Sequence, residues 1–232
     1  MLMPATDRTW RFGTSTRVMI GFVTVFMYGV AVLLVSLPFM AGVNDDPVAN
    51  AMIGATAVVM VGFGFFMTFG LIAIVRTRIG IDATMLHATV PSHHTLLVPH
   101  FRTIALPLAQ IRSVERRQEA FRSFGMINLR ESLSVVTTAG ERIGIFSNTS
   151  GPASQLPLDE IADAIASAAG MTVTDAGTVW TKSGGLYGEA SSSWSERPLD
   201  ETSATKVRRA ATRTAQLFVV LLLLVIALRA CG

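Results

Sequence analysis

The sequence predicts a membrane protein that combines two or three transmembrane helices with a small cytoplasmic β domain. Three observations lead to this fold class. Only 15% of the 232 residues are charged and 50% are apolar, whereas soluble domains carry about 25% charged residues. Two long apolar runs contain no charged residue. The residues that follow them alternate between apolar and polar positions, as half-buried strands do.

Residues 1–17 are a basic N-terminal arm, and residues 18–75 are the predicted transmembrane hairpin. The two uncharged runs cover 18–40 and 51–75, and each exceeds the roughly 20 residues that a helix needs to cross a hydrocarbon core. The loop between them carries Asp45 and Asp46 but no lysine or arginine, whereas arginines precede the first run and follow the second. The positive-inside rule therefore places the N-terminus and the residues after 76 in the cytoplasm.

Small residues in the second run would let a neighbouring helix approach closely. Gly64 and Thr68 stand four positions apart, and such small-xxx-small pairs favour close helix packing in membranes. Two interpretations fit equally well, packing against the first run or oligomerisation. The candidate helix-packing residues are Gly62, Gly64, Thr68 and Gly70.

Residues 76–170 are typical of a compact β-rich domain. Ile104, Leu106 and Leu108 share one face at the strand period of two. The segment RSVERRQEAF over 112–121 is a polar strand, for which we expect an edge position. The segment over 132–146 is a hairpin, because Gly140 accepts the positive φ of a tight turn. A helix over 157–170 caps the domain, since Pro157 suits a first turn and apolar residues recur at helical spacing.

A resemblance supports this organisation. The two N-terminal spans, the segment IALPLAQIRSVE, the hairpin LSVVTTAGERIGIF and the amphipathic helix together resemble bacterial membrane proteins with a pleckstrin-homology-like domain. The resemblance covers about residues 10–170, and its most specific part is the Pro-Leu-x-x-Ile turn before RSVERR. It implies a small, strongly bent β-barrel capped by one C-terminal helix, without enzymatic activity. The histidine-bearing segment and the third apolar run depart from the family pattern.

Residues 171–213 have the Ser/Gly-rich composition of a linker, which ends in a basic juxtamembrane segment. Trp180, Tyr187 and Trp194 are spaced along it. These aromatic residues either anchor the segment on a neighbouring surface or belong to an idle tether. Residues 214–232 form a shorter apolar run, which we expect either to span the membrane as a third helix or to lie in the interface. A third span would place the C-terminus on the outer side.

Arginines are frequent in the predicted β domain. Next to a cytoplasmic membrane surface they would attract anionic headgroups, at about 1 kcal/mol each, or an acidic partner. The alternative is a solvated strand face balanced by nearby glutamates. The candidate lipid- or partner-binding residues are Arg102, Arg112, Arg116, Arg117, Arg122 and Arg130.

All four histidines lie within 87–100, which raises the question of a metal site. His87 has the strand phase opposite to Leu86 and Ala88, so we expect it to face solvent. A metal needs three or four ligands that converge on one point, and the neighbouring pair in this segment would face opposite sides of a strand. We expect no metal site. The weak candidates are His87, His93, His94 and His100.

The functional expectation is a non-catalytic accessory or scaffold subunit of a larger membrane complex in the inner membrane. Walker, GxSxG and HExxH patterns are missing from the sequence, so we expect neither an enzyme nor a cofactor. The expected partners are other membrane subunits and not nucleic acid, with a homo-oligomer left open. The first alternative is a module that responds to anionic lipids. The second is a metal- or pH-sensing protein that uses the histidine segment.

Overall fold

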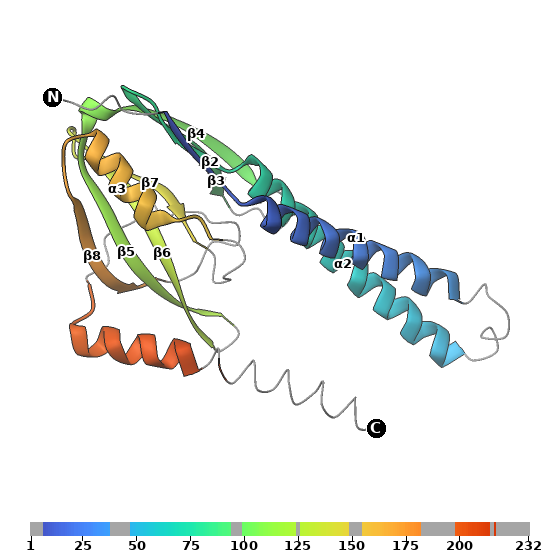
Figure 1. Ribbon diagram of the computed structural model, residues 1–232. Coiled ribbons are helices and arrows are strands. Elements are labelled where there is room, and N and C mark those ends of the chain that lie inside the picture. Colours follow the sequence, from blue (N-terminus) through green and yellow to red (C-terminus); the bar gives the residue numbers. More distant parts are fainter. Residues whose placement is uncertain are drawn as a thin grey trace.

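Two long apolar helices project from a β domain (Figure 1). The computed structural model describes residues 7–37, 47–93, 99–123, 126–148, 155–181, 198–213 and 216. Helix α1 is Thr14–Ser36 and helix α2 is Pro47–Arg76. Both are long and apolar enough to cross a membrane, which agrees with the first two predicted spans. The apolar run over 214–232, apart from residue 216, lies outside the described residues, as do His94, Tyr187 and Trp194.

The outer faces of the two helices are apolar. Every exposed large hydrophobic side chain in the described part of the chain lies on α1 or α2, among them Phe22 and Val58. A soluble protein rarely exposes such a large continuous apolar surface. Lipid tails or the helices of another subunit would cover it.

Helices α1 and α2 run side by side and contact each other through Gly64. A Cβ atom at this position would lie 2.9 Å from Cε1 of Tyr28, so only glycine lets the tyrosine ring approach the α2 backbone. The Tyr28 hydroxyl lies 3.2 Å from Oγ1 of Thr68. The predicted pair Gly64 and Thr68 therefore packs within the hairpin. Gly62 and Gly70 have open space around them and do not contribute to this interface.

The strands pair in two four-stranded sheets, and among the described residues they are not closed into the predicted barrel. The first sheet is antiparallel throughout, in the order β1-β2-β3-β4. The second has the order β7-β6-β5-β8, and its β5–β8 pair is parallel. The bounds of the strands are β1 Arg8–Arg11, β2 Arg78–Ile81, β3 Met85–His93, β4 His100–Pro107, β5 Ile111–Ser123, β6 Met126–Thr137, β7 Arg142–Ser147 and β8 Val173–Trp180.

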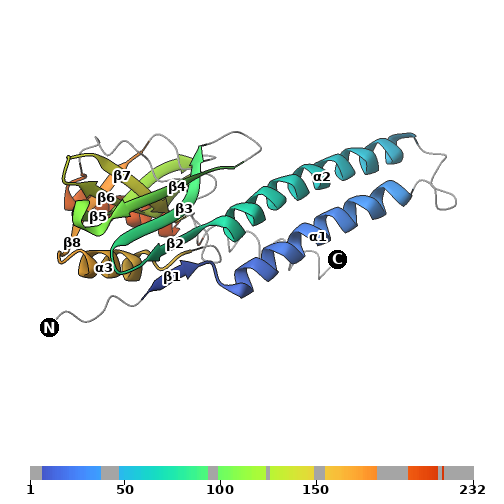
Figure 2. The same ribbon diagram turned by 90° about the horizontal axis from the view of Figure 1, so that it is seen from above.

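Short connections join the first sheet directly to the helix pair, as Figure 2 shows from above. Strand β1 ends at Arg11, three residues before α1 begins, and β2 begins two residues after Arg76, the last residue of α2. These two strands pair with each other. The predicted N-terminal arm over 1–17 therefore contains a sheet strand and the first turn of α1. Its four-residue strand is too short to show a periodic pattern.

Helix α3, Leu158–Ala168, packs against both sheets and confirms the predicted capping helix. Its apolar stripe, with Ile161 and Ile165, joins one core cluster that contains residues of both sheets. Nε1 of Trp10 in β1 donates a 3.0 Å hydrogen bond to Glu160 of α3. The predicted hairpin is β6–β7, and Gly140 in its turn has a φ of +82°.

Two predictions about the second sheet were wrong. The segment over 112–121 lies in β5, which is a central strand and not an edge strand, because β6 and β8 pair with its two sides. Strand β8 comes from the predicted linker over 171–213, and residues 201–213 of the same segment form a helix. Ala204 and Val207 on this helix are buried. The serine- and glycine-rich residues lie between these two elements, at 183–193, and the prediction extended their composition to the whole segment.

We expect substitution of Gly64 to weaken the helix pair. Gly64→Val would force Tyr28 away from α2 and break its contact with Thr68, and overpacking of this kind costs about 1–3 kcal/mol. Gly62→Val is the matched control, because nothing lies within 4 Å of its Cβ position. Unfolding of the full chain in mild detergent measures both variants. An equal effect of the two substitutions would contradict this packing.

Candidate functional site

The six arginines predicted as one binding surface are distributed among different environments. Arg112 is exposed, and the guanidinium of Arg122 lies 5.8 Å from the centroid of the Trp180 ring. Arg116 pairs with Asp159 of α3. Arg102 donates a hydrogen bond to the carbonyl of Gly144, and burial lowers its pKa. The remaining two, Arg117 and Arg130, are buried. The six do not form one surface.

The two buried arginines share one carboxylate. Oε1 of Glu119 accepts hydrogen bonds from Nε and Nη2 of Arg117 at 2.9 and 2.6 Å. Oε2 of the same glutamate lies 2.6 Å from both Nε and Nη2 of Arg130. Glu119 is fully buried, and each guanidinium is almost fully buried. Strand β5 supplies Arg117 and Glu119, and the β5–β6 register places Arg130 opposite Glu119.

This buried triad, Arg117–Glu119–Arg130, carries a net charge of +1 and continues as a polar strip along the sheet. Ser132 lies opposite Arg117 and forms a 2.5 Å hydrogen bond with Ser147. Charges in such a place are costly unless they are paired and hydrogen bonded. A slip of one residue between β5 and β6 would separate these partners, so the triad fixes the register of the sheet. Its role is structural.

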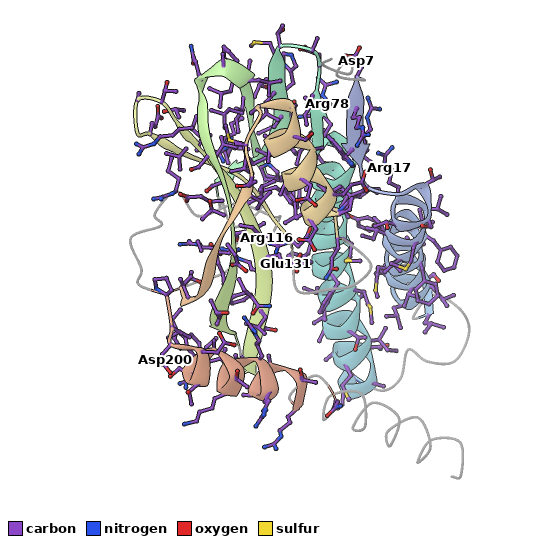
Figure 3. The ribbon with its side chains drawn as sticks, turned by 60° about the vertical axis from the view of Figure 1, so that its left-hand side comes forward. Asp7, Arg17, Arg78, Arg116, Glu131 and Asp200 are labelled. Atoms are coloured by element: carbon purple, nitrogen blue, oxygen red, sulfur yellow. The ribbon has the colours of Figure 1, made fainter. Side chains whose placement is uncertain are left out.

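A polar hollow of about 160 Å³ lies on the second sheet beside α3 and the helix over 201–213. Arg116 and Glu131, which belong to its lining, are seen between these two helices in Figure 3. Arg208 on the lower helix donates hydrogen bonds to Gln118 at 2.9 Å and to Thr178 at 3.1 Å. The lining contains three arginines and three carboxylates, which suits a polar protein surface better than a ligand of one charge.

The histidine segment does not assemble a metal site in the described residues. His87 is exposed, as predicted from its strand phase, and lies 2.9 Å from the carboxylate of Asp82. His100 is also exposed, and the backbone register pairs it with His93 across β3 and β4. No group of three or more potential metal ligands occurs among the described residues.

The carboxylate of Asp82 organises the turn between β2 and β3. It accepts hydrogen bonds from the backbone amides of Thr84 at 2.8 Å and Met85 at 2.7 Å. These two amides, followed by the contact with His87, lower the pKa of Asp82 to about 2. The carboxylate is therefore ionised at neutral pH and already has three partners.

Sequence reasoning missed a second hollow, on the outer face of the first sheet. This sheet groove has a volume of about 370 Å³ and is lined by residues of β1, β2, β3 and β4. Its lining includes Thr9, Arg11, Arg78, Gly80 and Thr89. Arg11 and Arg78 flank the two apolar runs, where their positive charge predicts only the topology of the spans. The register that places them opposite each other joins segments about 70 positions apart and leaves no local pattern.

Comparisons with known proteins give no match: no family model fits the chain, and no curated protein or solved structure is similar to it.

We expect Glu119 to be far more important for stability than a partly exposed glutamate. Glu119→Gln removes the carboxylate that forms ion pairs with two buried guanidinium groups, and breaking such a buried pair costs about 3–5 kcal/mol. Glu115→Gln is the control, because Glu115 pairs with the partly exposed Arg142 and such pairs contribute about 0–1 kcal/mol. Denaturant titration of the full chain compares them. Similar losses would show that the triad is not a special constraint.

We expect the amides of Thr84 and Met85 to report the ionisation of Asp82. Because the folded pKa lies below the ordinary value of 3.8, the turn contacts are fully present above about pH 4 and are lost as the pH falls through about 2. NMR titration of these amide shifts should therefore give a midpoint near pH 2. A midpoint near 3.8 would contradict the hydrogen bonding described here. Asp82→Asn should abolish the titration.

Proposed function

We propose that the protein is a non-catalytic accessory or scaffold subunit of a larger membrane complex, in which the helix pair holds the β domain at a fixed position against the bilayer. The observation that carries this proposal is the short, packed joint between the helices and the first sheet. An anchor of this kind suits a subunit that presents a surface in one orientation to fixed neighbours.

The joint is filled by buried side chains from both parts. Thr77, between α2 and β2, is fully buried, and its hydroxyl donates a 2.7 Å hydrogen bond to the carbonyl of Ala73. Phe12, between β1 and α1, packs edge-on against Phe146 of the second sheet, with ring centroids 6.0 Å apart. Ile74 at the end of α2 belongs to the core of the β domain. Bending at the joint would expose these groups, so the helices and the domain move as one body.

The surfaces available for partners support the same role. The apolar outer faces of α1 and α2 suit lipids or the helices of other subunits. The polar hollow between α3 and the helix over 201–213 suits a hydrophilic protein surface. The proposal includes an inner-membrane location with the β domain in the cytoplasm, based on the arginines that flank the spans. It also includes the pleckstrin-homology-like relationship, which two small sheets and a capping helix support.

We expect the tagged full chain, extracted gently from its native membrane, to travel in a discrete assembly with other membrane subunits in a fixed ratio. Native mass measurement reads out the assembly. Insertion of Gly-Ser-Gly between Gly13 and Thr14 should loosen the joint and reduce the co-purifying subunits several-fold. The same insertion after Gly140, in the exposed β6–β7 turn, is the control and should leave them unchanged.

A lone chain or a homo-oligomer from the native membrane would contradict the accessory role. A joint insertion that keeps the helical and sheet content by circular dichroism and still retains every co-purifying subunit would contradict the proposed importance of the fixed joint.

A further inference from the structure

We propose that the sheet groove binds the phosphate group of an anionic lipid headgroup through Arg11 and Arg78. This inference goes beyond the accessory role and does not depend on it. The groove lies on a different sheet from the polar hollow, and Figure 3 shows Arg78 of the groove apart from Arg116 and Glu131 of the hollow.

Strand alternation turns the two arginines outward together. Trp10 and Ile79 are register partners, and both are buried in the core. Because successive side chains point to opposite faces, Arg11 and Arg78 leave the sheet on its outer side, where they are exposed and directly opposite each other. Thr89 of β3 is the register partner of Arg78 and accepts a 3.5 Å hydrogen bond from its Nε.

The two cations have no internal counter-charge. Directly opposed residues have Cβ atoms about 4.5–5.5 Å apart, and like charges at such positions repel. No carboxylate of the described residues forms an ion pair with either arginine. The lining contains two carboxylates, Asp7 and Asp82. Asp82 is occupied by two backbone amides and His87. Both lie toward the other end of the groove, Asp7 four residues from Arg11 and Asp82 four residues from Arg78, which is about 13 Å at about 3.3 Å per residue. A dianion or monoanion placed between the arginines would relieve their repulsion.

The floor of the groove is Gly80 of β2, two residues after Arg78, and its register partners are Thr9 of β1 and His87 of β3. A Cβ atom there would lie 3.3 Å from Oγ1 of Thr9 and 3.5 Å from the carbonyl of Arg8. Glycine inside a strand commonly marks the close approach of a backbone or ligand. The missing side chain leaves a depression flanked by the threonine hydroxyls at 9 and 89, which are hydrogen-bond donors that suit phosphate oxygens.

The position of the groove favours a lipid over free phosphate. Arg11 lies three residues before the start of α1, and Arg78 lies two residues after the end of α2. The arginine end of the groove therefore lies level with the ends of α1 and α2 that adjoin the β domain. If the helices span a bilayer, its headgroup phosphates are concentrated at this level. The anionic lipids of a cytoplasmic leaflet attract arginines at this level by about 1 kcal/mol per residue.

The test titrates the full chain in mild detergent with dioleoyl-phosphatidylglycerol and, separately, with dioleoyl-phosphatidylcholine, and native mass spectrometry counts the bound lipids. We expect the wild-type chain to prefer phosphatidylglycerol. R11Q/R78Q should weaken phosphatidylglycerol binding by roughly tenfold or more and leave phosphatidylcholine binding unchanged. Thr89→Val removes one hydroxyl from the site without changing its charge and should cause a smaller loss. Arg112→Gln, an exposed arginine of the second sheet, is the control and should have no effect.

Three results would overturn the proposal. The first is equal binding of the two lipids by the wild-type chain. The second is an unchanged preference in R11Q/R78Q whose unfolding temperature matches that of the wild type. The third is displacement of phosphatidylglycerol by inorganic phosphate in tenfold excess, since it would assign the groove to a free anion. If R11Q/R78Q fails to fold, Thr89→Val decides the test. A reduced preference of Thr89→Val for phosphatidylglycerol over phosphatidylcholine supports the site, and an unchanged preference overturns it.

Discussion

The pairing of β1 with β2 is the constraint on which the rest of the structure depends. Strand β1 precedes α1 and β2 follows α2, so their antiparallel ladder can form only if the two helices return to the same level and lie side by side. In turn, β2 of this ladder pairs with β3, and β3 pairs with β4. Strand β1 brings Trp10 within hydrogen-bond distance of Glu160 of α3. Helix packing, sheet register and the position of the capping helix are thus parts of one arrangement.

The same register couples stability to the proposed lipid site. A shift of one residue between β1 and β2 would turn Trp10 out of the core and bury Arg11, because the side-chain period of a strand is two. The core therefore selects the register that places Arg11 opposite Arg78. Burial of the core residues is therefore sufficient to keep the two arginines on the outer face. A site built in this way exists before its ligand arrives.

Local signals in the sequence predicted the parts of the fold that depend on neighbours in the chain. The two spans follow from length and composition, the β6–β7 hairpin from Gly140, and α3 from its apolar spacing. Elements that depend on distant partners were missed. Strand β1 has only four residues and pairs with residues 70 positions away. Strand β8 is hidden in a polar segment, and it makes β5 a central strand.

Two of the six candidate arginines are buried for a related physical reason. A charged residue in a strand is ordinarily solvated, so the sequence alone predicts Arg117 and Arg130 to be surface groups. Their burial depends on Glu119, and the register that joins Glu119 to Arg130 is a property of the folded sheet. Counting charges in the sequence cannot separate an arginine that is paired inside the protein from one that faces outward. Side-chain direction, which comes from long-range strand pairing, makes that distinction.

The buried arginines of the second sheet are paired with a carboxylate, whereas the exposed arginines of the first sheet are not. The difference in dielectric environment explains this contrast. Inside the second sheet, water cannot screen Arg117 and Arg130, so the chain supplies a carboxylate with hydrogen bonds to both. At the outer face of the first sheet water screens the charges, and even unit charges at a 4 Å separation repel by only about 1 kcal/mol in water. The repulsion between Arg11 and Arg78 is therefore small in water. Near a membrane surface the effective dielectric constant is lower, the repulsion grows, and so does the gain from an anion bound between them. A bilayer crossed by the two apolar helices would thus also supply the counter-charge that the sheet lacks.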